Sequence, residues 1–458
     1  MTLKKRPNIF IIVLDTLRKD YSENIERTLE KMGFVNYTHA IAPSPWTIPS
    51  HASMLTGLYP SFHRAHETRT KKIPHVKLVQ GDSLLTFKLR RAGYTTALLT
   101  ANFFVHPEFG FKGFDYVYYS PPMTVPSILS QSERKVISDL FSVYQDIHSV
   151  AMYLFSRRKY KLLLKSALQY SLNRSYPYIM ALIKHWPIEK GITSITKNLD
   201  SYLDRLGHSK YYNNFVFINT IEMHEPYLVN DNLSVLSEHL KTGNLDQGFA
   251  TKWRIRYDTQ AKYLVHKLSS LLHVLESHDI FDNSLIVVTS DHGQLLGEHG
   301  RIGHGNFLYD ELLRVPLLIK YPSFMDVHTS NCIDDEWKWI SLNSLKSLTV
   351  NIAMNKKGVS DEVLFSDVVF SESYGIAGKV IPNNTTELKN IMHLEKYRIA
   401  VYYRTFKGIF NVTNWKFEDI ISYDPSISIT PNIVSEMKKA VVQFLKRQLL
   451  VKRLRKLG

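Results

Sequence analysis

Three side chains that bind metals well follow apolar segments with the composition of buried strands. Asp15 comes directly after the segment 8–14, and Asp291 and His292 follow the segment 284–289. Because ligands of open α/β sheets gather at the carboxyl ends of strands, we expect these three side chains to converge. Two carboxylates and one imidazole suit a divalent cation such as Mn, Ca, Mg or Zn. The alternative, that each Asp only caps the helix after its strand, is weakened by the presence of two such Asp residues.

A hydroxyl group in the segment 44–57 is placed to act as a nucleophile. Pro49 fits the first position of a helix, so Thr47 is expected just ahead of the helix N-terminus. Free N–H groups and the helix dipole favour an anion there. A metal that lowers the pKa of the hydroxyl would activate it. The alternative is that Thr47 is an ordinary helix cap.

Apolar segments that resemble buried strands alternate with helical patterns and predict the elements that position these residues. The strand candidates besides 8–14 and 284–289 are Thr95–Thr100, Phe215–Asn219 and Val315–Tyr321, and helical spacing is found at 83–92 and 253–277. This alternation predicts an α/β fold with a mostly parallel sheet flanked by helices.

Two regions depart from the α/β alternation. Residues from about 118 to 212 are predicted to form a helical insertion, with helices at 132–155 and 159–172. We expect it to cover the active-site face and to contact an extended anionic or glycan substrate; a plain surface excursion is the alternative. Residues 323–458 are predicted to form a smaller α+β domain that ends in a basic helix, which leaves 1–322 as the main domain.

Composition excludes several classes of protein. The chain has 458 residues, 44% of them hydrophobic, and a net charge of +15, which is unlike a disordered or fibrous chain. A single cysteine, Cys332, excludes an intramolecular disulfide framework. The apolar run at residues 9–14 is too short to cross a bilayer. We therefore expect a soluble, cytoplasmic protein with an anionic partner.

The terminal helix, expected from Ser435 to about Leu457, is rich in lysine and arginine. Its basic face is either solvated or in peripheral contact with an anionic membrane. Nucleic acid is not expected as a partner, because Phe444 is the one aromatic residue of this segment and stacking on bases would be poor.

The motifs together resemble the sulfatase family of the alkaline phosphatase superfamily. They include Asn-Ile-Phe-Ile-Ile-Val-Leu-Asp at 8–15, Thr-Ile-Pro-Ser-His-Ala-Ser-Met-Leu-Thr-Gly at 47–57 and Ser-Asp-His-Gly at 290–293. Further matching blocks are 93–96, 113–115, 219–227, 294–300, 314–316 and 424–425. The resemblance implies that Asp15, Asp291 and His292 hold one metal ion together with the oxygen of Thr47, the nucleophile. It also implies that His224 contacts the anion or the leaving group.

Several positions depart from the family pattern. Sulfatases have Cys or Ser, converted to formylglycine, where this chain has Thr47, and they have Arg where it has His51. His304 stands where many relatives have an anion-binding Lys, and it is expected to supply a hydrogen bond or a proton. Asn102 is expected to contact the anion in place of a missing Lys/His pair. Many relatives have a second Asp where this chain has Thr16, and this change resembles the phosphonate monoesterase-like and phosphodiesterase-like members, which have fewer acidic ligands.

An unmodified threonine favours phosphorus chemistry, because it lacks the formylglycine route for expelling sulfate. The predicted function is therefore hydrolysis of a phosphate or phosphonate ester. The molecule that carries this ester is expected to be a glycan or a lipid-linked substrate. The alternatives are a sulfuric ester hydrolase, a phosphoryl-group transferase acting on a glycan or surface polymer, and a non-catalytic anion-binding homologue. A second metal would need an Asp followed closely by His, and the stretch 219–224 has no such Asp.

Overall fold

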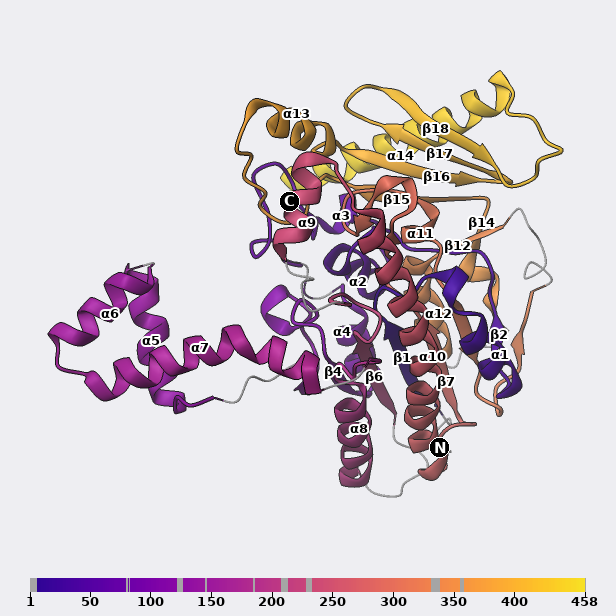
Figure 1. Ribbon diagram of the computed structural model, residues 1–458. Coiled ribbons are helices and arrows are strands. Elements are labelled where there is room, and N and C mark those ends of the chain that lie inside the picture. The colour runs from indigo at the N-terminus through magenta and orange to yellow at the C-terminus, as the bar shows by residue number, and fades with distance from the viewer. Residues whose placement is uncertain are drawn as a thin grey trace.

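The computed structural model describes residues 6–79, 81, 83–121, 127–144, 146–183, 186–206, 213–227, 233–330, 338–354 and 358–457. Cys332 and Asp82, the residue expected to cap the helix at 83–92, lie outside these ranges. Figure 1 shows a body of helices around a central sheet, a second sheet on top of it and a helical arm at one side.

The central sheet has seven strands in the order β2-β10-β7-β1-β6-β4-β5. Five neighbouring strands run parallel, and β10 pairs antiparallel with β7 and with β2. The strands are β1 (Asn8–Leu14), β2 (Val35–Asn36), β4 (Thr95–Thr100), β5 (Tyr116–Tyr119), β6 (Asn214–Thr220), β7 (Ser284–Thr289) and β10 (Leu317–Lys320). The predicted α/β fold with a mostly parallel sheet is confirmed.

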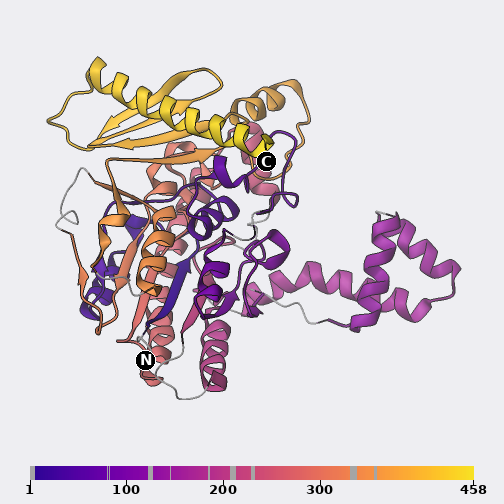
Figure 2. The ribbon, with the colours of Figure 1, turned by 180° about the vertical axis from the view of Figure 1, so that it is seen from behind.

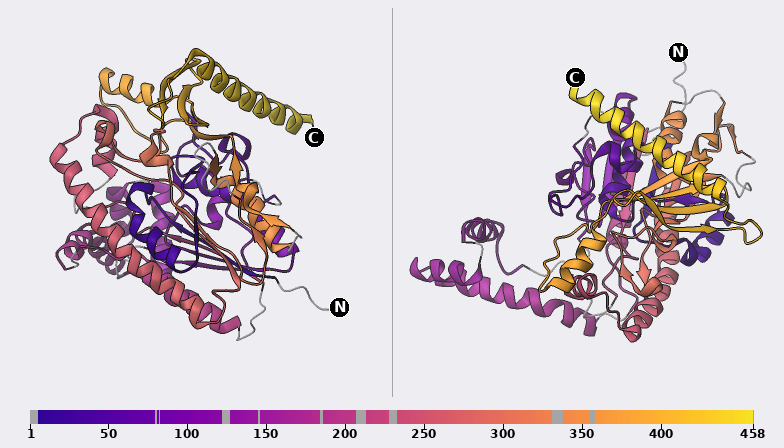
Figure 3. Two further views of the ribbon diagram at one scale, coloured as in Figure 1. Left: turned by 90° about the vertical axis from the view of Figure 1, so that its right-hand side faces the viewer. Right: turned by 90° about the horizontal axis from the view of Figure 1, so that it is seen from above.

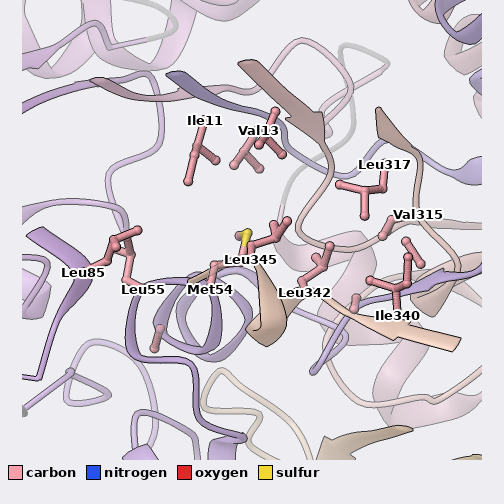
Figure 4. Packing of buried hydrophobic residues seen from close by; sticks show 14 of the residues in the cluster. Ile11, Val13, Met54, Leu55, Leu85, Val315, Leu317, Ile340, Leu342 and Leu345 are labelled. Carbon is pink, nitrogen blue, oxygen red and sulfur yellow. The ribbon is translucent and has the colours of Figure 1, made fainter. Parts of the chain in front are cut away.

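Helices cover both faces of this sheet because alternate residues of its buried strands point to opposite sides. Ile11 and Val13 belong to the core on the side of α2 (Thr47–Thr56), α4 (Leu85–Arg91) and α12 (Leu345–Ala353), as Figure 4 shows. Phe10 and Ile12 pack on the opposite side against α1 (Glu23–Lys31), α8 (Ile192–Leu206) and α10 (Gln247–Ser277). The two cores fix the strand ends that carry the site.

The predicted insertion divides into two parts. Its last helix, α8, packs on the central sheet, whereas α5 (Gln131–Tyr144), α6 (Ile147–Ser156) and α7 (Tyr160–Ile183) form an arm that projects sideways from the body (Figures 1 and 2). The helix predicted at 132–155 is in fact two helices, because Asp146 accepts a hydrogen bond from the Ser149 N–H and caps a new helix. Figure 3 shows the arm from above, extending away from the sheet rather than over it, so these three helices do not cover the active-site face as the whole insertion was expected to do.

The C-terminal part contains an antiparallel sheet, β15 (Val368–Ser373), β16 (Arg398–Tyr403), β17 (Phe406–Asn411) and β18 (Lys416–Ser422), covered by α14 (Pro431–Leu457). Met437, Val441 and Phe444 of α14 are buried against it. The predicted boundary at residue 323 does not coincide with a break in packing, because α12 lies in the core of the main body. The separate sheet begins at β15.

Shorter elements complete the described structure. A three-stranded sheet contains β3 (Ala40–Ile41), β12 (Trp339–Ser341) and β14 (Phe365–Ser366). A two-stranded sheet contains β8 (Leu295–Leu296) and β9 (Ile302–Gly303). β11 (Val327–His328) pairs with β13 (Val359–Ser360), and the remaining α-helices are α3 (Pro60–His63), α9 (Leu233–Thr242), α11 (Asp310–Leu313) and α13 (Thr385–Leu394). Among the described residues, no helix has both the length and the apolar character that spanning a membrane requires.

Candidate active site

Strands β1, β6 and β7 end at one edge of the central sheet, and their register brings polar side chains together there. Val13 of β1 lies between Asn219 of β6 and Thr289 of β7, so Asp15 and Asp291 leave the sheet next to each other. Both carboxylates are fully buried. The convergence predicted from the strand ends is therefore present in the structure.

Asp15 is held by amide side chains of two neighbouring strands. Its Oδ2 accepts a hydrogen bond from Asn102 Nδ2 at 2.7 Å and a longer one from Asn219 Nδ2 at 3.4 Å. Its Oδ1 is buried and has no hydrogen-bond partner. Burial and the nearby charge of Asp291 raise the pKa of Asp15. Asn102 is thus placed to orient Asp15, and its contact with the anion stays a prediction.

One carboxylate oxygen of Asp291 accepts two backbone N–H groups, and two imidazole rings lie near the other oxygen. Oδ1 accepts the N–H of Thr16 at 3.3 Å and that of His292 at 3.0 Å. Oδ2 has no hydrogen-bond partner, although ring nitrogens of His51 and His292 lie 3.3 and 3.4 Å away. Burial raises the pKa of Asp291, but the charges of His292 and His51 outweigh this and lower it overall.

Thr16 adopts a left-handed backbone conformation, with φ of 64°, that a β-branched residue rarely tolerates. The reason is visible in its N–H, which this conformation directs at Asp291 Oδ1. Strained backbone of this kind is concentrated at functional sites. The turn after β1 therefore serves the arrangement of the carboxylates.

His292 has one ring nitrogen available to the cluster. Nδ1 lies 2.8 Å from the carbonyl oxygen of Gly293 and donates to it, because a carbonyl oxygen can only accept. In the neutral ring, Nε2 then carries a lone pair, which points away from Gly293 and toward the cluster. That nitrogen lies 3.4 Å from Thr47 Oγ1 and 4.0 Å from Asp15 Oδ1. A neutral histidine fixed in this tautomer by its second nitrogen is the usual form of a metal ligand.

Gly293 is required for this loop to pack. Its N–H donates to the carbonyl of Leu312, and a Cβ atom at residue 293 would lie 2.0 Å from the carbonyl oxygen of Glu311. A side chain at residue 293 would therefore push the loop away and displace His292.

The donor set fits a divalent cation. Ligand atoms of Asp15, Asp291 and His292 all lie within 4.8 Å of one another. Two buried carboxylates at this separation repel, and the oxygen that each leaves unpaired has lost its contact with water without gaining a hydrogen bond. A cation placed among them would remove both costs.

Thr47 stands at the N-terminus of α2. The helix begins at Thr47 itself, with Trp46 as the capping residue, so the start predicted with Pro49 as the first helical residue is two residues late. The Thr47 side chain is 2% exposed. Its hydroxyl faces His292 and lies next to the fully buried carboxylates.

His51, predicted to contact substrate, lies one turn further along α2 and is fully buried. Its Nδ1 donates to the carbonyl of Thr47 at 3.0 Å, and its Nε2 accepts from Asn219 Nδ2 at 2.9 Å. Burial lowers the pKa of His51, but the carboxylate of Asp291, whose Oδ2 lies 3.3 Å from Nδ1, outweighs this and raises it. Both ring nitrogens are engaged by groups inside the protein, so His51 supports the site from behind, and its contact with substrate stays a prediction.

A second group of titratable side chains lies beside the first. His304 stacks obliquely on His292 with ring centroids 4.6 Å apart, and the His224 ring lies 5.0 Å from that of His304. Glu225 Oε2 is 3.4 Å from His224 Nδ1 and 3.5 Å from His304 Nδ1, and it accepts from Gln294 Nε2. Glu225 and Gln294 were not identified from the sequence, because their roles depend on two loops meeting.

The two histidines of this group differ in charge. Burial lowers the pKa of His304 to about 3, and its Nδ1 donates to Gln294 Oε1 at 2.8 Å, so it is a neutral imidazole. Burial also lowers the pKa of His224, but Glu225 and Asp15 outweigh this and raise it. Lys190 Nζ donates to the His224 carbonyl and fixes that loop. Ligand atoms of His224, Glu225 and His304 also lie within 4.8 Å of one another, so this group too has the donors of a metal site.

Comparisons with known proteins agree with this fold. A solved phosphonate monoester hydrolase from Silicibacter pomeroyi superimposes with a TM-score of 0.59 at 16% identity, over 98% of this chain and 96% of that one. Choline-sulfatase of Rhizobium meliloti is 23% identical over 365 residues, 69% of this chain and 63% of the relative. N-acetylglucosamine-6-O-sulfatase of Bacteroides thetaiotaomicron is 47% identical over 55 residues, 12% of this chain and 10% of the relative. The matches thus span less than two thirds of these curated relatives.

The family model described as Sulfatase matches residues 7–324, which carry β1, α2, β6, β7 and every side chain of the site described above. This chain therefore belongs to the Sulfatase family.

Proposed function

We propose that this protein is a metal-dependent hydrolase that cleaves a phosphate or phosphonate ester with Thr47 as the nucleophile. The observation that carries the proposal is the position of Thr47 Oγ1, at the N-terminus of α2 and 3.4 Å from His292 Nε2. The helix N-terminus favours an anionic group in front of it. Asp15 and Asp291 supply the negative charge that a metal ion needs beside the hydroxyl.

One divalent metal ion is proposed, held by Asp15, Asp291 and His292 with the oxygen of Thr47 nearby. When bound, it would lower the pKa of the Thr47 hydroxyl and offset charge that develops on the ester oxygens. Asn102 and Asn219 orient Asp15, and the Thr16 N–H orients Asp291. The carboxylates of Asp15 and Asp291 are therefore held in place before substrate binds. Less free energy is then needed to rearrange the site during the reaction.

The choice of phosphorus over sulfur rests on the side chain of residue 47. A formylglycine hydrate releases sulfate by re-forming its aldehyde, whereas a threonine ester has no such route. The adduct on Thr47 must therefore be removed by an acceptor such as water, and a phosphothreonine is the kind of ester that survives long enough for this. The neutral His304, where relatives have a lysine, further separates this site from that of the sulfatases.

The proposed reaction has two displacements at phosphorus. In the first, the Thr47 hydroxyl releases its proton to solvent, Oγ1 forms a bond to phosphorus, and the ester oxygen leaves with a proton from His224. His224 is the better donor because its pKa is raised, whereas His304 is held neutral. In the second, water attacks the phosphothreonine and gives a proton to His224, and the bond from phosphorus to Thr47 Oγ1 breaks as Oγ1 takes up a proton from solvent.

A panel of chromogenic substrates tests this proposal. Phosphate monoesters, phosphate diesters, phosphonate monoesters and sulfate esters are assayed with Mn, Ca, Mg and Zn in turn. We expect turnover of a phosphorus ester at least tenfold above that of the sulfate ester, and its loss in Thr47→Ala. The matched control is Thr56→Ala, at the other end of α2, where the hydroxyl donates to the Ala52 carbonyl and accepts the Leu58 N–H. Preferential cleavage of sulfate esters would support the sulfuric ester hydrolase, and phosphoryl transfer to an added alcohol without release of phosphate would support the transferase.

A further inference from the structure

The arm, defined as residues 127–183, exposes an unusual amount of apolar surface. It holds 12 of the 27 large apolar side chains that are exposed among the described residues, although it contains 57 of 458 residues. Exposed apolar residues that gather in one place, rather than singly, mark an interaction surface. The arm projects from the body in every view that shows it in profile (Figures 1, 2 and 3).

The apolar surface is most pronounced at the outer end of the arm, where α6 turns into α7. Met152, Phe155, Tyr160 and Leu164 are 52–63% exposed there. Behind them, a cavity of about 630 Å³ lies between the three helices, lined by apolar side chains such as Phe141, Ile147, Val150, Leu154 and Leu163. The helices of the arm are therefore not closed into a dry core, and their apolar side chains continue from the interior to the surface.

Basic residues surround this apolar tip. Arg157, Arg158, Lys159 and Lys161 are all exposed, and the sequence from 147 to 183 contains six Lys or Arg residues and no Asp or Glu. Long basic side chains beside exposed aromatic and aliphatic ones are the composition of segments that lie at a lipid headgroup boundary. Each such cation is attracted to the negative surface of an anionic bilayer.

We propose that the α6–α7 tip of the arm is a docking surface for an anionic lipid bilayer. The apolar side chains enter the headgroup region, and the four cations pair with lipid phosphates. With 10 residues, α6 is about half the length needed to cross a bilayer, so contact is interfacial. A second copy of the chain fits less well, because a two-fold contact at this tip would bring the two basic clusters against each other.

Vesicle co-sedimentation tests the docking surface with the full-length protein. We expect binding to vesicles of phosphatidylcholine with 30% phosphatidylglycerol at low salt, weaker binding at 500 mM NaCl, and no binding to phosphatidylcholine alone. Arg157→Glu, Lys159→Glu and Lys161→Glu together should weaken binding at least tenfold. These three side chains are exposed, so the charge reversal leaves the fold intact, as circular dichroism should verify.

The matched control reverses Lys438, Lys439 and Lys446 to Glu, three exposed lysines of the basic helix α14. This variant should bind as the parent protein does. Equal binding of the parent and the arm variant, or loss of binding in the α14 variant alone, would overturn the proposal in favour of α14. A dimer in solution that is lost in Phe155→Ala with Leu164→Ala, with no vesicle binding, would overturn it in favour of a second copy.

A fluorescence measurement supports the same test independently of sedimentation. In Phe155→Trp, the indole is expected to shift its emission to shorter wavelength with anionic vesicles but not with neutral ones. An emission maximum that stays the same with both would contradict insertion of the tip. The docking surface does not depend on the reaction catalysed, so neither outcome bears on the function of Thr47.

Discussion

Asn102 determines the orientation of Asp15 and is therefore expected to set metal affinity. Removing a group that orients a metal ligand typically costs about 10–100-fold in affinity. We expect Asn102→Ala to raise the metal dissociation constant by that factor while activity at saturating metal largely recovers, as titration of activity with metal would show. Asn411→Ala is the control, since it removes a similar buried amide–carboxylate bond, to Glu418, within the C-terminal sheet. Equal metal affinity in both variants would contradict the positioning role of Asn102.

Glu222 is expected to make stability fall as pH rises. Its carboxylate is buried after β6, and one oxygen accepts the N–H groups of Lys190 and Ile192. Burial raises its pKa to about 7 from the ordinary value of 4.5. Between these values the folded chain binds more protons than the unfolded chain, so the free energy of unfolding decreases with increasing pH. At about 1.4 kcal/mol per pKa unit, the loss approaches about 3 kcal/mol.

Urea unfolding at pH 5 and pH 8 measures this effect. Glu222→Gln keeps the acceptor oxygen and removes the titration, so the difference between the two pH values should shrink by a comparable amount. An unchanged difference would mean that Glu222 ionises without penalty in the folded protein.

The positions of Asp15, Thr47, Asp291 and His292 could be predicted from the sequence because each depends on one strand or helix end. The roles of His51 and Asn102 could not. Both lie behind the first group and act through partners from other strands, Asn219 and Asp15. Residue type alone does not distinguish a side chain that faces substrate from one that faces a ligand of the metal.

At the level of elements, α14 is expected to be a packing helix over its first half. Phe444 is 5% exposed, stacks on Phe370 at 4.4 Å and meets Tyr59 edge-on at 5.3 Å. Phe444→Ala should lower the free energy of unfolding by about 3–4 kcal/mol. The control is Leu449, which lies on the same helix but is 56% exposed. Leu449→Ala should change the free energy of unfolding by less than about 0.5 kcal/mol. Similar small effects in both variants would mean that α14 is only loosely attached.

The strands of the central sheet could be predicted because both of their faces are buried and their sequences are continuously apolar. β18 was not predicted, because its side chains are mostly exposed and it lies at the edge of its sheet. The direction of β10 is likewise invisible in its own residues, since it depends on the path of the segment 290–316 that connects it to β7. The path of the arm could not be predicted either, because its helices pack on one another and not on the sheet.

At the level of the whole molecule, one divalent ion per chain is expected to stabilise the fold. An ion at a hundredfold excess over its dissociation constant contributes about 2.7 kcal/mol. Thermal unfolding should therefore occur at a higher temperature with metal than after chelation, and Asp291→Ala should remove the difference. The double variant Asp200→Ala and Asp204→Ala, in an exposed acidic group with His278, is the control and should keep it.

Elemental analysis of the purified protein checks the number of ions. Two ions per chain would show that His224, Glu225 and His304 hold a second one, contrary to the single-metal proposal. The net charge of +15 favours anionic partners of every kind, and the cytoplasmic location and the absence of nucleic-acid binding stay predictions from composition.

The central claim, that Thr47 carries the reacting group, is tested most directly by trapping the intermediate. The protein is mixed with a phosphorus ester that it turns over, quenched in acid and digested, and the peptide that contains Thr47 is weighed by mass spectrometry. The account predicts one added phosphoryl group, or an alkylphosphonyl group from a phosphonate, on Thr47, absent from Thr47→Ala together with turnover. An unmodified Thr47 peptide combined with full turnover in Thr47→Ala would contradict it and would assign the attack to water.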